Sequence, residues 1–196
     1  MAKVEQIRYF DDTGKWKQNT AAVVEIVDRE LKSSRIKHVV MATCTGYTGA
    51  QFAPLAEANP KASFVGVAMA TAIDKIYDVK WSARYGKIME QAGVKLVRGT
   101  HALTGGIDRA LQEQFKGYAP GTLIARTLYL FSQGMKVCVE IIAMACDAGV
   151  LPEGVQVVSC AGTGHGSDTA ILARSAASAN LFEMDIHRVL AMPLKK

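Results

Sequence analysis

The chain has 196 residues, of which 49% are hydrophobic and 21% are charged, and its formal net charge is +5. This length and composition predict one folded domain over 1–196 with a substantial core, and they exclude a disordered or fibrous chain. The basic residues are dispersed, with no run of five or more, which argues against nucleic-acid binding, while the positive charge favours a phosphorylated small-molecule ligand.

The N-terminal residues and the most apolar stretch both favour a soluble protein. Residues 1–12 are polar and mixed in charge, unlike a secretory signal. The stretch 137–151 contains Glu140 and Asp147 and is too short to span a bilayer, so it predicts a buried helix. We therefore expect a cytoplasmic protein without a membrane partner.

The cysteines indicate neither a disulfide framework nor a metal site, because they form no CxxC motif and none has zinc-finger spacing to a histidine. Reduced thiols and no bound metal are the expectation. Cys138 and Cys146 lie on an apolar segment and are expected in the core. Cys44 precedes a helix, where a thiolate is stabilised, but without a motif for a base a small buried residue is favoured over a nucleophile.

Helical periodicity of apolar residues, with capping residues before it and glycine or proline after it, predicts the helices. They are expected at 20–33 (capped by Asn19 or Thr20), 48–58, 82–92, 104–115, 122–132, 135–148 and 183–191. Runs of apolar and β-branched residues predict strands at 36–42, 62–69, 94–98 and 155–159. Residues 70–80 indicate irregular structure, and 169–174 fits either a strand or a helix.

The alternation of strands and helices predicts an α/β fold. Because the strands are apolar throughout, we expect a mostly parallel sheet buried on both faces, in a three-layer α/β/α sandwich. Ligands of such sheets bind at the carboxyl ends of the strands, near a switch in strand order.

Three glycine-rich loops follow three of these strands. They read TCTGYTG at 43–49, GTHALTGG at 99–106 and GTGHGSDT at 162–169. Glycine lets a ligand approach the backbone amides, and the serine and threonine hydroxyls add donors, so such loops suit a phosphate. Since all three leave carboxyl ends, we expect them to meet at one crevice.

Each loop also has a purely structural interpretation. The first precedes a helix N-terminus, which favours an anion site over an ordinary tight turn. The third is neither a dinucleotide fingerprint nor a P-loop, so a ligand contact and a structural loop stay equally open. His101 and His165 either donate to a phosphate and act in acid–base chemistry, or bond to nearby backbone.

Two further groups of residues have competing interpretations. Lys136 and Glu140 form an i, i+4 pair for which a solvated edge is favoured over a buried partner for a loop. Tyr9, Phe10 and Trp16 are expected to form a packed N-terminal arm rather than a cover for a planar ligand.

Four segments together carry a resemblance to the C-terminal α/β domain of pyruvate kinase, and more closely to small stand-alone bacterial and archaeal proteins built from that domain. They are Val39–Phe52, Gly99–Arg109, Gly134–Pro152 and Gly162–Ile171. In pyruvate kinase this domain is regulatory, and its strand–Thr/Ser/Gly–helix loop grips a sugar phosphate. That pattern has a basic residue where this chain has Tyr47, and an aromatic residue there suits a ligand with a flat ring.

The stand-alone relatives look like flavin mononucleotide (FMN) binders, so the resemblance implies FMN here. It implies phosphate contacts from the 43–48 loop and further contacts from the other two loops. The candidate ligand-binding residues are Thr43, Cys44, Thr45, Gly46, Tyr47, Thr48, Thr100, His101, Thr104, Gly162, Thr163, Gly164, His165 and Gly166.

The activity stays open between three alternatives. In the first, the chain only binds FMN. In the second, it is an enzyme that uses a flavin, or that acts on a phosphorylated metabolite with His101, His165 or Asp168 as acid or base. In the third, it is a regulatory module that senses a sugar phosphate or nucleotide. A homo-oligomer is consistent with all three. The chain is too short for a (β/α)₈ barrel of about 250 residues, so we do not expect a pyruvate kinase.

Overall fold

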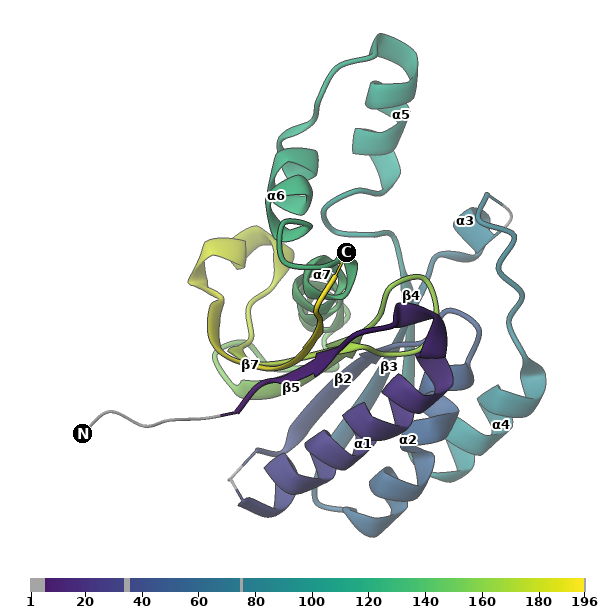
Figure 1. The fold of residues 1–196 in the computed structure, drawn as a ribbon. Coiled ribbons are helices and arrows are strands. Elements are labelled where there is room, and N and C mark those ends of the chain that lie inside the picture. The colour runs from purple at the N-terminus through teal and green to yellow at the C-terminus, as the bar shows by residue number, and fades with distance from the viewer. Residues whose placement is uncertain (1–5, 34–35, 75, 196) are drawn as a thin grey trace.

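The computed structural model describes residues 6–33, 36–74 and 76–195, which form an α/β fold with a mixed seven-stranded sheet flanked by helices (Figure 1). The strand order is β1-β7-β6-β5-β2-β3-β4. Only β6 runs antiparallel to its neighbours among the described strands. The strands are β1 Arg8–Phe10, β2 His38–Ala42, β3 Ser63–Met69, β4 Lys95–Gly99, β5 Gln156–Ala161, β6 Thr169–Arg174 and β7 Asp185–Pro193.

The helices follow the predicted order, with boundaries that shift by a few residues. They are α1 Trp16–Ser33, α2 Tyr47–Ala58, α3 Thr71–Asp74, α4 Ala83–Gln91, α5 Gly106–Phe115, α6 Pro120–Leu128 and α7 Gln133–Asp147, with 3₁₀ turns η1 Thr13–Lys15 and η2 Ser178–Glu183. The short α3 lies in the stretch expected to be irregular.

Two separate cores cover the two faces of the sheet. In β2, Val39 and Met41 pack with residues of α1, α2 and α4, whereas Val40 packs with residues of α7 on the opposite face. Figure 1 shows this division, with α1, α2 and α4 on one side of the sheet and α7 on the other. The expectation of a sheet buried on both faces is therefore confirmed for the central strands. It is wrong for β4, an edge strand on which Lys95 and Leu96 are exposed.

The two ends of the described chain form strands that the sequence pattern did not predict. The prediction of a helix at 183–191 is wrong, because most of this segment lies in β7, which pairs with β6 and β1. The pairing of β6 with β7 is irregular at two places, where His187 and Leu190 have no partner in β6. The apolar residues of β7 therefore do not alternate as in a regular strand, and their spacing resembles that of a helix. The segment 169–174 is the strand β6.

The order of strands reverses beside β2. The chain runs outward from β2 to β3 and β4, and then returns through α7 to β5 on the other side of β2. The loop that leaves β2 continues into α2 on one face of the sheet, whereas the loop that leaves β5 turns back into the antiparallel strand β6. The carboxyl ends of the strands beside such a reversal in strand order are the usual ligand position in a sheet of this kind.

Helices α5 and α6 form an arm that projects from the rest of the molecule (Figure 1). Helix α5 has no buried residue, and large apolar side chains on the arm, such as Ile107, Phe115 and Tyr118, are exposed. The arm joins the body through the second glycine-rich loop at one end and through the start of α7 at the other.

Candidate functional site

A cavity of about 630 Å³ lies at the carboxyl ends of β2, β3 and β5. All three glycine-rich loops contribute to its wall. The predicted residues that line it are Cys44, Thr45, Tyr47, Thr48, His101, Thr104, Gly162, Gly164, His165 and Gly166. Four predicted residues do not line it, namely Thr43, Gly46, Thr100 and Thr163.

The first loop is shaped by its own hydrogen bonds. The Thr43 hydroxyl accepts from the Gly49 amide at 2.9 Å, and the Thr43 carbonyl accepts from the Gly46 amide at 3.1 Å. Gly46 has a φ of +88°, and a Cβ there would lie 2.8 Å from Cβ of Tyr85, so only glycine fits. Thr43 and Gly46 therefore build the turn, while Thr45 and Thr48 face the cavity at the N-terminus of α2.

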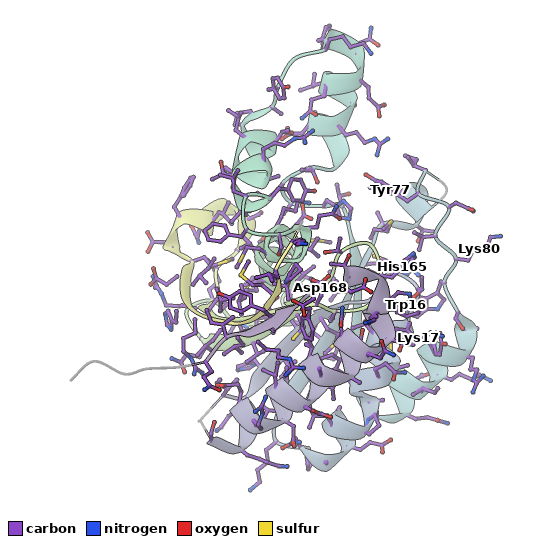
Figure 2. All side chains as sticks on the ribbon, in the orientation of Figure 1. Trp16, Lys17, Tyr77, Lys80, His165 and Asp168 are labelled. Carbon is purple, nitrogen blue, oxygen red and sulfur yellow. The ribbon has the colours of Figure 1, made fainter. Side chains whose placement is uncertain are left out.

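Aromatic rings form one wall of the cavity. The ring of Trp16 lies edge-on to Tyr47 at 4.9 Å between centroids and 5.7 Å from His165, and Tyr47 in turn lies 5.8 Å from Tyr85. Trp16 and His165 lie beside one another in Figure 2. The prediction of a packed N-terminal arm is thus wrong for Trp16, which lines the cavity, and for Tyr9, which is exposed, and it is confirmed for Phe10, which is buried in a core.

The third loop is held by Asp168 and by helix α1. Both carboxylate oxygens of Asp168 accept hydrogen bonds, one from the Thr163 amide at 2.9 Å and one from the Thr169 hydroxyl at 2.8 Å. Gly166 has a φ of +63°, and a Cβ there would lie 2.4 Å from Oγ1 of Thr20. Asp168 is buried and does not line the cavity, so it supports the loop rather than facing a ligand.

A buried ion pair occupies the wall that α7 contributes. Lys136 Nζ lies 2.5 Å from Oε2 of Glu140, and the two side chains are only 3% and 2% exposed. Glu140 Oε1 accepts from the Leu103 amide at 2.9 Å, and Lys136 donates to the Thr104 hydroxyl at 2.8 Å. The solvated-edge interpretation is therefore wrong, and the alternative, a buried partner for a loop, is confirmed.

The structure also brings residues to the cavity that sequence reasoning missed. Tyr77, Tyr85, Tyr129 and Gln133 all line it, although they come from separate segments with no shared motif. Burial, with a smaller effect of the Glu140 carboxylate, raises the pKa of Tyr129. This tyrosine therefore stays protonated at neutral pH and is available as a hydrogen-bond donor.

Cys44 is the only cysteine on the cavity wall within the described ranges. It is half-buried, which differs from the expected small core residue. Cys138 and Cys146 lie in the core as predicted, and burial raises the pKa of Cys146 to about 11.

His101 lies on the cavity wall close to the Lys136–Glu140 pair. Burial lowers the pKa of its imidazole from the usual 6.5; Glu140 opposes this shift, and Lys136 and Arg109 add to it. The neutral ring is therefore the form present at pH 7, with one nitrogen as donor and the other as acceptor.

This lowered pKa predicts a specific loss of stability in acid. Below the ordinary histidine pKa, His101 takes up a proton in the unfolded chain but not in the folded protein. The free energy of unfolding therefore decreases as the pH falls through this range. Between about pH 7.5 and about pH 5.5, His101→Gln should lose less stability than the unchanged protein in urea denaturation. His187→Gln, at an exposed position, should retain the original pH dependence. Identical pH slopes for all three proteins would contradict the prediction.

Neither a metal site nor a membrane-spanning helix is evident in the part of the chain that the structure describes. No three histidine, cysteine or acidic side chains gather there as metal ligands. No helix in the same ranges combines the length and the apolar character needed to cross a bilayer.

Comparison with known proteins assigns no family. No protein-family profile matches the chain. A ligand-bound variant of O-ureido-L-serine synthase shares 19% sequence identity over 71% of this chain, with a TM-score of 0.30. The chain spans about half of the length of that structure, at 48%. Such a distant likeness carries no functional argument, so the function has to be argued from the cavity itself.

Proposed function

We propose that this protein binds a phosphorylated small molecule with a flat aromatic ring system, and that FMN is the first candidate. The observation that carries the proposal is the convergence of three glycine-rich loops on one cavity with an aromatic wall. The resemblance to stand-alone relatives of the pyruvate kinase C-terminal domain, with its three-layer α/β/α arrangement, points to the same ligand.

The residues present fit the two parts of FMN. Trp16, Tyr47 and Tyr85 offer ring faces and edges against which a flavin ring can pack. A cavity of about 630 Å³ falls within the range of small-molecule sites, about 300–1,000 Å³. The apolar side chains of Val67, Ile141 and Met144 would cover the remainder of the ring.

The phosphate would lie at the N-terminus of α2. Thr45 and Thr48 line the cavity there, and the helix dipole favours an anion at that end. The amides of Gly46, Tyr47 and Gly49 already have partners within the loop, so the threonine hydroxyls would be the main donors. FMN would supply electron- or hydride-transfer chemistry when bound.

A sensing role is the second candidate, because the cavity wall is joined to the projecting arm. Leu103 and Thr104, which lead into α5, are hydrogen-bonded to the ion pair on α7. A ligand that contacts His101 or Thr104 would therefore touch the base of an arm with exposed apolar residues. Light scattering with and without FMN distinguishes this role: a ligand-dependent change in subunit number favours sensing, and a constant size counts against it.

The visible absorption spectrum of the purified protein and a fluorescence titration with FMN test the proposal. Flavin bands near one equivalent per chain, or saturable binding of added FMN, are expected. Tyr47→Ala should weaken FMN binding by about tenfold, because one ring contact is lost. Tyr118→Ala, at an exposed position on the arm, should leave the affinity unchanged. A colourless protein that takes up no FMN would refute the flavin proposal.

A further inference from the structure

Lys136 is a buried cation with an unused hydrogen-bond donor. An ammonium group has three N–H donors. The described residues supply acceptors for two of them, the Glu140 carboxylate at 2.5 Å and the Thr104 hydroxyl at 2.8 Å. Lys136 is only 3% exposed and lines the cavity, so its ammonium group is already largely removed from bulk water. A ligand in the cavity can therefore accept the third hydrogen bond without a further desolvation cost for the ammonium group.

The neighbours of Lys136 define the kind of atom that fits. Glu140 neutralises its charge, so the pair as a whole would not attract a phosphate dianion and would place a carboxylate near it. Thr104, neutral His101 and Gln133 supply further donors and acceptors on the same wall. Such a group of donors and acceptors without net charge is complementary to a ligand edge that carries both carbonyl oxygens and ring N–H groups.

The position of Lys136 separates it from the expected phosphate end. Helix α7 packs on one face of the sheet, and α2 packs on the other. The cavity therefore runs across the edge of the sheet from the N-terminus of α2 to the side chains of α7. A ligand with its phosphate beside Thr45 and Thr48 would extend its ring system toward Lys136.

We propose that Lys136 is a ligand-binding residue that donates a hydrogen bond to a carbonyl oxygen on the pyrimidine edge of the bound flavin. This inference rests on the proposed function and goes beyond it, since it fixes which end of the ligand faces α7. Glu140 is then a positioning residue that holds Lys136 and the Leu103 amide in place.

The test compares two flavins and two proteins. FMN and riboflavin share the pyrimidine edge, but only FMN carries the phosphate. The paired variant K136M/E140Q removes the donor without leaving Glu140 as an unpaired buried charge, and the unchanged protein is the reference because either single substitution would leave one buried charge unpaired. Dissociation constants come from fluorescence titration, and the thermal midpoint of each variant reports whether it is folded.

An equal loss of affinity for FMN and riboflavin in K136M/E140Q, about tenfold relative to the unchanged protein, is the expected result. A loss for FMN alone would place the phosphate at Lys136 and overturn the assignment, and no loss for either flavin would reduce Lys136 to a structural role. If the unchanged protein binds neither flavin, the proposed function itself fails, which is a different outcome from the previous two.

Should K136M/E140Q fail to fold, K136Q/E140Q provides the second comparison. Its two amides can bond to each other and to the Leu103 amide and Thr104 hydroxyl, so the wall keeps hydrogen bonds without charge. A smaller but still equal loss for both flavins supports the assignment, and unchanged affinity for both overturns it.

Discussion

Glu140→Ala should lower the free energy of unfolding by about 3–5 kcal/mol, because it leaves the Lys136 ammonium buried without its counter-charge. The same substitution removes the acceptor of the Leu103 amide, which is itself buried. Breaking a buried pair is costly even where the intact pair adds little net stability, since the remaining charge has lost both water and its partner. Urea denaturation followed by circular dichroism measures the change.

The chain offers a control with the same helical spacing. Arg109 and Glu113 form an i, i+4 pair at 2.8 Å on α5, with side chains 30% and 65% exposed. Glu113→Ala should change the stability by about 0.5 kcal/mol or less, because water replaces the lost partner. Similar effects of the two substitutions would show that the Lys136–Glu140 pair is hydrated in solution and would contradict its burial.

Asp168→Ala should lower the free energy of unfolding by about 2–3 kcal/mol and also weaken FMN binding. The substitution leaves the half-buried Thr163 amide and the buried Thr169 hydroxyl without their charged acceptor. The Thr169 hydroxyl also lies 3.2 Å from Oγ of Ser132, which caps α7, so the loss is expected to reach the start of that helix. Urea denaturation and FMN titration on the same preparations measure both effects.

Asp168→Asn is the matched control. Its amide oxygen can still accept from the Thr163 amide, and its nitrogen can donate to Thr169, so stability and affinity should remain close to those of the unchanged protein. If the Asn variant instead binds FMN as poorly as the Ala variant, the charge of Asp168 matters to the ligand, and the structural role argued above is insufficient.

The sequence predicted the edge of the sheet at which the cavity lies. Carboxyl ends of parallel strands share one edge, so loops that follow such strands meet there whatever the details of packing. The boundaries of α2 and β3 were also predictable, because glycine, proline and apolar runs mark them locally. The sequence alone therefore predicted that the loops beginning at Thr43 and Gly162 lie next to each other.

The ion pair on α7 was not predictable, because its environment comes from remote residues. An i, i+4 lysine and glutamate on a helix are usually solvated, and the acceptor and donor that bury this pair belong to a loop more than thirty residues earlier. Trp16 is a comparable case, since its ring reaches the cavity only because α1 begins beside the third loop. In β7, register irregularities removed the alternation that identifies a strand.

Helix α7 fills one core with Cys138 and Ile142 and faces the cavity with Lys136, Glu140 and Ile141. Most substitutions on this helix will therefore change stability and ligand affinity together. Because both properties change at once, few replacements on α7 can be accepted by selection. The rings of Tyr47 and Tyr85 are only partly buried, His165 is exposed, and all three residues lie outside both cores. Ligand preference can accordingly diverge among descendants of this protein through the aromatic wall, while α7 stays nearly constant.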